Sequence, residues 1–433
     1  MSNARVMRRS GKRRSDIVRS SPAVARTRLV ARRRSLGKST ISAKPRLRVN
    51  ARRAEVVALV NRGHMALAAD DLRAALEAYE DALEIDPFEL QAHLGLALGY
   101  QRLGDDDASE RHRRDAIKLA PVRTIPYRGT GQPIRVLALL ATANANIDLE
   151  PLLPNDLCAI TLAHVDAMPA GAELPRHDIL FNAIGDADAA ERALTIANVI
   201  VSRSDAPLVN HPTAVANTRR DRNAARLRAL PSLRVPRIAR IARERLHAGQ
   251  ARLSLAAAGI SYPFLLRSPG FHNGRFLSLV EDPTKLGAAL GTLPGDELYA
   301  IEYIDTRDKR GYYCKYRALF IGDQIVPVHA ALSTTWKVHY EVADLASSEL
   351  GRALDRDFRR YPRARIGERA YAALEAVRSE LGLQYAGVDF CLDDEGNPVL
   401  FEANATMLPG KASERARKAT LALIRGLLAP SAG

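Results

Sequence analysis

Two short strands near the C-terminus carry polar residues at positions where an apolar residue would be usual. The segment AGVDFCLDDEGNPVLFEANAT (386–406) has strand-forming residues on both sides of a DDEGN turn, which predicts a β-hairpin. Glu402 and Asn404 lie two residues apart on the returning strand, so strand geometry places both side chains on one face. Asp389, on the outgoing strand, is expected beside them.

Two carboxylates and one amide oxygen make an oxygen-only ligand set, which suits Mg²⁺. The alternative is an ordinary hairpin with exposed acids, as turns such as DDEGN often have. Glu402 and Asn404 favour the metal, because they interrupt an apolar strand rather than lie in the turn. Without the metal, Asp389 and Glu402 are expected to repel each other.

The pattern GVDF-(x)₁₀-FEAN resembles the metal-binding hairpin of the ATP-grasp superfamily. It is most similar to the glutathione synthetases, the D-alanine–D-alanine ligases and the ribosomal-protein glutamate ligases. The resemblance implies an α/β fold in which a pre-ATP-grasp parallel sheet precedes two α+β grasping subdomains. It also implies two Mg²⁺ ions on the triphosphate of ATP, with Mn²⁺ as a substitute. Asp389 and Glu402 would hold one ion, and Glu402 and Asn404 the other.

The resemblance extends to segments that would hold the phosphates of ATP. Arg222, in VNHPTAVANTRRDR, and Arg267, in YPFLLRSPG, stand where the family has lysines. An arginine can bind phosphate oxygens in bidentate fashion, although either residue could instead be an ordinary charge. Gly270 and Gly274 would let the following loop approach the phosphates through backbone N–H groups.

A further segment, IEYID (301–305), resembles the hinge that holds adenine. The backbone groups of Tyr303 and Ile304 would contact the base, while Glu302 or Asp305 would bind the exocyclic amine or the ribose. An ordinary amphipathic strand is the alternative.

The segment CKYRALFIGDQIVPVH (314–329) is predicted to be a hairpin that turns at Gly322-Asp323. Its first strand resembles one that carries an arginine near the transferred phosphoryl group, which matches Arg317. A fixed guanidinium stabilises the negative charge that develops there. Lys315 shares the face of Arg317 by alternation. Lys337 and His339 lie in a loop where such enzymes often recruit the second substrate, although lone residues in a loop usually have no such role.

Upstream, residues 63–87 and 99–121 align at a period of 34 residues, with small residues and a terminal proline in register. This resembles a pair of tetratricopeptide repeats, which implies a peptide or protein partner. Helices are expected near 55–68, 72–85, 89–102 and 106–119.

Beyond a linker rich in Pro, Gly and Thr, strands and helices alternate, which favours a parallel α/β sheet. Strands are expected at 134–140, 157–165, 177–185 and 206–212, with a helix at 188–200. The predicted organisation is a disordered basic arm (1–52), a tetratricopeptide-like helical domain (53–121), a pre-ATP-grasp domain (122–213) and an ATP-grasp domain (214–430).

The net charge of +15 arises in the arm, since residues 1–53 contain 18 Lys or Arg and one acidic residue. Such a segment cannot bury a core, so it is expected to be disordered. It could contact nucleic acid or an anionic membrane, act as a transit peptide or simply be solvated. Three scattered cysteines, with no apolar run of transmembrane length, indicate a cytoplasmic protein, and the Arg- and Ala-rich composition suggests a bacterial source.

Together these features predict an ATP- and Mg²⁺-dependent ligase that joins a carboxylate to an amine through an acyl-phosphate, releasing ADP and phosphate. The alternative is a non-catalytic ATP-binding scaffold whose tetratricopeptide unit does the work. Arg222 and Arg267 in place of lysines favour the scaffold, whereas the intact Asp389, Glu402 and Asn404 oppose it.

Overall fold

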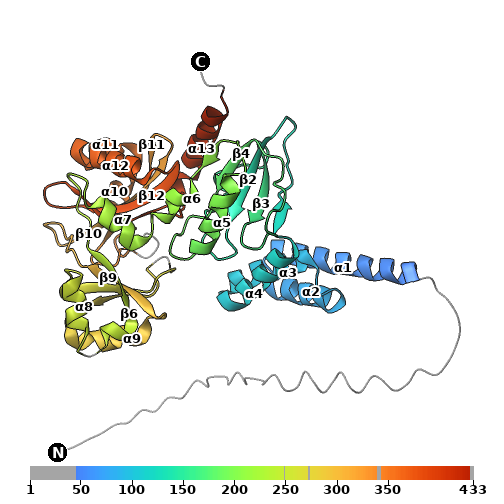
Figure 1. The fold of residues 1–433 in the computed structure, drawn as a ribbon, viewed down its shortest axis with the longest axis horizontal. Coiled ribbons are helices and arrows are strands. Elements are labelled where there is room, and N and C mark those ends of the chain that lie inside the picture. Colours follow the sequence, from blue (N-terminus) through green and yellow to red (C-terminus); the bar gives the residue numbers. More distant parts are fainter. Residues whose placement is uncertain (1–44, 248, 272–273, 339–342, 430–433) are drawn as a thin grey trace, which may run out of the picture. The chain divides into compact units, whose positions relative to one another are not determined.

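The computed structural model describes residues 45–247, 249–271, 274–338 and 343–429 (Figure 1). The chain divides into two units, residues 1–58 and 59–433. Most of the predicted arm lies outside the described residues. Helix α1, Pro45–Ala68, begins earlier than expected, so residues 45–52 are helical rather than part of a disordered arm.

Three more helices follow at the positions that the repeat predicted. They are α2 (Leu72–Ile85), α3 (Leu90–Leu103) and α4 (Asp106–Leu119). Asp71 and Asp105 cap α2 and α4, where each side chain accepts a hydrogen bond from the N–H three residues on. The peptide partner expected for this unit stays a prediction.

Tyr79 of α2 is the largest side chain inside this helical unit, and it is fully buried. A Cβ atom added to Gly63 or Gly95 would lie 2.5 Å or 2.3 Å from the Tyr79 ring. Glycine at these two positions therefore lets the neighbouring helices close on the ring.

A five-stranded sheet follows in the order β1-β3-β2-β4-β5. The strands are β1 (Val122–Thr124), β2 (Ile134–Leu140), β3 (Cys158–His164), β4 (Ile179–Asn182) and β5 (Leu208–Val209). Strands β2 to β5 pair in parallel and β1 is antiparallel. The predicted parallel sheet is confirmed, although β5 keeps only two residues of the expected 206–212. Helix α5, Glu191–Val201, follows β4.

Two four-stranded antiparallel sheets make up the rest, in the orders β6-β9-β7-β8 and β11-β10-β12-β13. The first contains β6 (Ile238–Ala242), β7 (Phe264–Arg267), β8 (Leu277–Val280) and β9 (Glu297–Glu302). The second contains β10 (Tyr313–Ile321), β11 (Gln324–Ser333), β12 (Tyr385–Leu392) and β13 (Pro398–Asn404). The helices are α6 (Pro212–Ala216), α7 (Arg220–Leu227), α8 (Ala251–Ala257), α9 (Leu286–Thr292), α10 (Glu349–Arg360), α11 (Pro362–Ile366), α12 (Glu368–Leu381) and α13 (Ser413–Leu428).

Both predicted hairpins are present in the second sheet. Its register sets His329 opposite Arg317, Arg317 opposite Asp389, and Asp389 opposite Glu402. Directly opposed residues of an antiparallel pair point to the same face. Four strands thus bring polar side chains from distant parts of the sequence into one row.

Asn210 directly follows strand β5 in the chain and links that strand to the second sheet. Its Oδ1 accepts a hydrogen bond from the N–H of Tyr385 at 2.9 Å, and its Nδ2 donates to the carbonyl of the same residue at 2.8 Å. Asn210 is fully buried and has a φ of 61°, a conformation that asparagine tolerates better than most residues. The pair of bonds fixes the start of β12.

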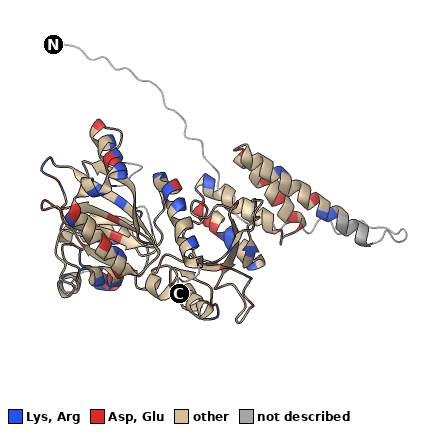
Figure 2. Cartoon of the chain, turned by 90° about the horizontal axis from the view of Figure 1, so that it is seen from above, with Lys and Arg blue, Asp and Glu red and all other residues tan. Residues whose placement is uncertain are grey.

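Acidic and basic side chains are interspersed along the described elements (Figure 2). This mixture agrees with a basic excess confined to the arm. Among the described residues, no helix is both long and apolar enough to cross a bilayer.

Replacing Gly95 with alanine tests the packing around Tyr79. The new methyl group meets a ring that has no room to move, so we expect a loss of about 1–3 kcal/mol in the free energy of unfolding. Gly426→Ala is the matched control: a Cβ at this helical glycine meets nothing within 4 Å, and the change should stabilise the helix by about 0.5–1 kcal/mol. Denaturant unfolding followed by far-UV circular dichroism measures both. Equal stabilities would contradict the packing described for Tyr79.

Candidate active site

Asp389 is the most tightly held group in the row across the second sheet. It is 4% exposed and accepts hydrogen bonds from Arg317 at 2.6 and 2.8 Å. Lys315 Nζ lies 3.1 Å from Asp389 Oδ2. The prediction that Lys315 and Arg317 share one face is confirmed.

These two cations decide the ionisation of Asp389. Burial alone would raise the pKa of this carboxyl, but Lys315 and Arg317 outweigh burial and hold the pKa well below its usual range. The carboxylate is therefore charged and paired. Each carboxylate has its own cationic partner, which offsets the repulsion expected between Asp389 and Glu402.

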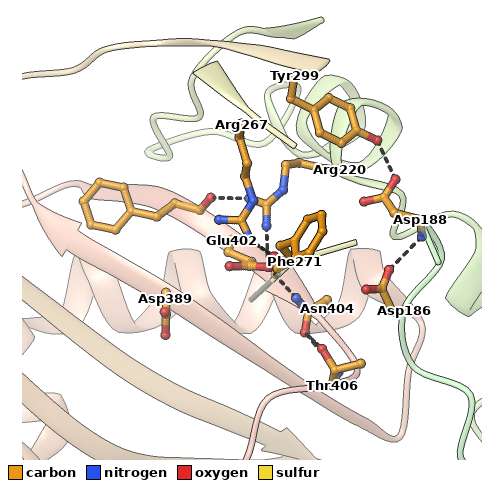
Figure 3. Close-up of polar contacts among 12 residues, drawn as sticks. Asp186, Asp188, Arg220, Arg267, Phe271, Tyr299, Asp389, Glu402, Asn404 and Thr406 are labelled. Carbon is orange, nitrogen blue, oxygen red and sulfur yellow. Dashed lines mark hydrogen bonds and ion pairs between the residues drawn. The ribbon is translucent and has the colours of Figure 1, made fainter. Parts of the chain in front are cut away.

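The partner of Glu402 is Arg220, which donates to Glu402 Oε1 (Figure 3). Asn404 Nδ2 donates to the same oxygen at 2.8 Å, so the shared face predicted for Glu402 and Asn404 is confirmed. The amide oxygen of Asn404 accepts two hydrogen bonds from Thr406, each of 3.0 Å. In this state the amide therefore presents its NH₂ group, and not its oxygen, to Glu402.

Of the two neighbouring arginines, Arg220 pairs with Glu402 and lines both cavities, whereas the predicted phosphate ligand Arg222 lines neither. Arg220 lies at the start of α7 on the buried face, three, four and seven residues before the buried Asn223, Ala224 and Leu227. Arg222 is exposed on another face of the helix. The helical period of the buried residues was the signal that could have selected Arg220.

The second predicted phosphate ligand, Arg267, ends strand β7 and is 7% exposed. It donates to the carbonyl of Phe271 in the following loop. Burial lowers the pKa of Arg267 to about 10, and the positive charge of Arg220 adds to this effect. Burial would also lower the pKa of Arg220, but Glu402 and Asp188 outweigh it and the pKa is raised. Arg220 and Arg267 therefore lie close to each other and to the carboxylates of Asp186, Asp188 and Glu402.

Two cavities meet at Arg220, Arg267 and Glu402. The larger cavity has a volume of about 180 Å³, and the smaller one of about 40 Å³. A water molecule needs only about 10–15 Å³ on this measure, so the larger cavity has room for a sizeable ligand. Lys315, Arg317 and Asp389 line the larger cavity, and Asn404 lines the smaller one.

The predicted hinge borders the larger cavity only in part. Glu302, Tyr303 and Ile304 line it, with Glu302 accepting a hydrogen bond from the N–H of Arg237 at 2.9 Å. Asp305 is exposed and pairs with Arg307, so the structure does not bring it to the site.

The two loop glycines border different cavities. Gly274 lines the larger one and Gly270 the smaller one, and both have positive φ. Lys337 also lines the larger cavity, whereas His339 lies outside the described residues.

Besides Arg220, three further polar residues at the site were missed from the sequence. Asp186 and Asp188 follow strand β4, and Tyr299 of β9 donates its hydroxyl hydrogen to Asp188 (Figure 3). Both acids lie just beyond the carboxyl end of a parallel strand, which is where open α/β sheets commonly bind ligands. That position was the available signal.

No protein-family model matches the sequence, and no curated protein is similar to it. Several solved structures are similar. The D-alanine–D-alanine ligase of Bacillus anthracis, complexed with ATP, has 14% identity, covering 68% of this chain and 96% of that one with a TM-score of 0.42. The RimK domain ATP-grasp protein of Sphaerobacter thermophilus has 17% identity; the match covers 68% of this chain and 100% of that one, with a TM-score of 0.42. The D-cycloserine synthetase DcsG has 18% identity, covering 67% and 99% with a TM-score of 0.43.

Asp389→Asn tests the ion-pair arrangement without any ligand. The substitution leaves Lys315 and Arg317 without their counter-charge, so we expect the free energy of unfolding to fall by roughly 2–4 kcal/mol. Asp394→Asn, in the exposed turn of the same hairpin, should change it by less than about 0.5 kcal/mol. Thermal or denaturant unfolding at neutral pH compares the two. A stability equal to that of the unchanged protein for Asp389→Asn would contradict the pairing.

Proposed function

We propose that the chain is an ATP- and Mg²⁺-dependent ligase of the ATP-grasp type that joins a carboxylate to an amine. The observation that carries the proposal is the clustering of Lys315, Arg317, Arg220 and Arg267 around the adjacent carboxylates Asp389 and Glu402. Polyphosphate bound with a divalent metal requires cations for its oxygens and carboxylates for the metal. This cluster supplies both along one cavity.

The donor chemistry fits Mg²⁺. Asp389 and Glu402 are opposed on adjacent strands, and Asn404 contacts Glu402. Among the described residues, no group of three or more His, Cys, Asp and Glu side chains could hold a metal. The ligand set would therefore combine the two carboxylates with the Asn404 amide oxygen, which must turn away from Thr406. When bound, the metal would neutralise charge on the phosphates.

The larger cavity fits the nucleotide. Glu302, at the end of strand β9, and the next two residues, Tyr303 and Ile304, line the cavity where the base would lie. The cationic cluster lines the same cavity. Arg220, and not Arg222, would contact phosphate alongside Arg267. Both guanidinium groups are pre-positioned by burial, so little reorganisation is needed when the anion arrives.

The proposed reaction uses no protein nucleophile. A carboxylate oxygen of the substrate attacks the γ-phosphorus and ADP leaves, which forms an acyl-phosphate. The amine nitrogen then attacks the acyl carbon, the bond to phosphate breaks, and the nitrogen loses a proton. Arg317 and Lys315 line the cavity where the transferred group would lie, and they stabilise its negative charge.

The competing function is an ATP-binding scaffold without catalysis. Arginines in place of lysines favour it, because a guanidinium holds phosphate without the compact charge of an ammonium. The ion pairs of Asp389 and Glu402 oppose it, since a scaffold has little use for two carboxylates held by Lys315, Arg317 and Arg220. Peptide recruitment by the helical unit is compatible with either function.

Arg317→Ala separates ligase from scaffold. Losing a donor at the developing charge typically costs about 10²–10³ in rate, or roughly 3–4 kcal/mol. Nucleotide affinity should stay within about tenfold, or around 1.4 kcal/mol, because the contacts of the base remain. The assay is ADP release in the presence of candidate carboxylates, with hydroxylamine trapping the acyl-phosphate as a hydroxamate.

Arg310→Ala is the control for this assay. Its side chain is 55% exposed and pairs with Asp308 just before strand β10, so its removal should leave both affinity and turnover unchanged. If a broad carboxylate screen with the unchanged protein yields neither ADP nor hydroxamate, the scaffold is the better description.

A further inference from the structure

The two cavities differ in the charge of their linings. Among the described residues, the larger cavity has five basic side chains (Arg220, Arg267, Lys315, Arg317 and Lys337) and three acidic ones (Glu302, Asp389 and Glu402). The smaller has two basic side chains (Arg220 and Arg267) and three acidic ones (Asp186, Asp188 and Glu402). A polyanion therefore suits the first cavity, whereas a group with positive charge suits the second.

Asp186 and Asp188, the two acidic residues that line only the smaller cavity, lie in one loop and are held by hydrogen bonds. Asp186 is 8% exposed, and its Oδ1 accepts hydrogen bonds from the N–H groups of Asp188 and Ala189 at 2.8 and 3.2 Å. Asp188 accepts a hydrogen bond from Tyr299, which also lines the cavity (Figure 3). Burial raises the pKa of Asp188, against the opposing effect of Tyr299. A cation in the cavity would relieve the cost of keeping this carboxylate charged.

The side-chain oxygen of Asn223 is a second observation that points to a ligand in this cavity, because it is a buried acceptor with no donor among the described residues. It lines the smaller cavity and is 4% exposed. Its Nδ2 donates to the carbonyl of Ala403 at 2.8 Å, which fixes the orientation of the amide. The Oδ1 atom is buried, and no described residue donates to it. A buried acceptor of this kind normally has a partner.

The size of the smaller cavity limits the ligand. Its volume of about 40 Å³ corresponds to a few water molecules. A small amine fits, or the amino end of a longer molecule, whereas a bulky side chain does not.

We propose that the smaller cavity binds the protonated amino group of a small primary amine, held by Asp186 and Asp188 with Asn223 as an additional acceptor. An ammonium has three N–H donors and no acceptor, which matches two carboxylates and one amide oxygen. That this amine is the second substrate rests on the proposed function. The site adjoins Glu402, which places such an amine next to the carboxylates that would hold the metal.

Binding measurements without nucleotide test the site directly. The probes are D- and L-alanine and methylamine, compared with lactate, which has the carboxylate of alanine but no amine. Ligand-observed NMR should show at least tenfold tighter binding of one alanine enantiomer than of lactate. Asp188→Asn should remove this difference. Glu150→Gln, at an exposed acid outside both cavities, should leave it intact.

Thermal unfolding establishes that each variant is folded. If Asp188→Asn is not, Asp186→Asn is measured with the same expectation. If neither alanine nor methylamine binds the unchanged protein more tightly than lactate, the amine site is wrong. If both bind and Asp188→Asn leaves the preference intact, the assignment of these acids is also wrong. ATP binding is measured separately, so its absence would count against the proposed function and not against the amine site.

Discussion

The site depends on keeping the Asp389 carboxylate charged inside the protein. A buried carboxylate normally becomes neutral, and Asp389 avoids this because Lys315 and Arg317 lie on the adjacent strand at 2.6 to 3.1 Å. Glu402 is paired with Arg220, which comes from a different element. These ion pairs hold the cations and carboxylates in place before any ligand binds. Phosphate oxygens would then take over the cations, and a metal would take over the carboxylates. Pre-arrangement of this kind reduces the cost of binding a highly charged ligand.

Two tertiary contacts position this charged row. Asn210 bonds both backbone groups of Tyr385, which ties the parallel sheet to the beginning of strand β12. Arg234 pairs with the start of β13: its N–H donates to the carbonyl of Pro398 at 2.8 Å, and its carbonyl accepts from the N–H of Leu400 at 2.8 Å. Hydrogen bonds to the backbone thus fix the start of β12 and the start of β13. Asp389 and Glu402 therefore keep a defined position along their strands. Arg220 of α7 and Arg267 of β7 then lie around the same cavity.

The division of charge between the two cavities suggests a physical basis for separating two substrates. Arg220 and Arg267 border both cavities, so they lie where an anionic ligand and an amine would meet. Basic groups dominate on one side, and Asp186 and Asp188 make the other side acidic. Like-charge repulsion would keep each ligand out of the wrong cavity, which gives specificity without close shape matching. The scaffold alternative offers no reason for the acidic side.

The sequence by itself determined the local arrangements. Strand alternation placed Lys315 on the face of Arg317, and Glu402 on the face of Asn404. The DDEGN turn set Asp389 beside Glu402. These relations depend only on the period of a strand and on a short hairpin. The 34-residue repeat likewise located the helices. The helical period could have shown which arginine of α7 is on the buried face. Only the tertiary structure decided that this arginine faces Glu402, that Asp305 points away, and that Asp186 and Asp188 close a second cavity. Those outcomes depend on how separate elements pack, and packing is set by buried surfaces that come together from distant positions in the chain.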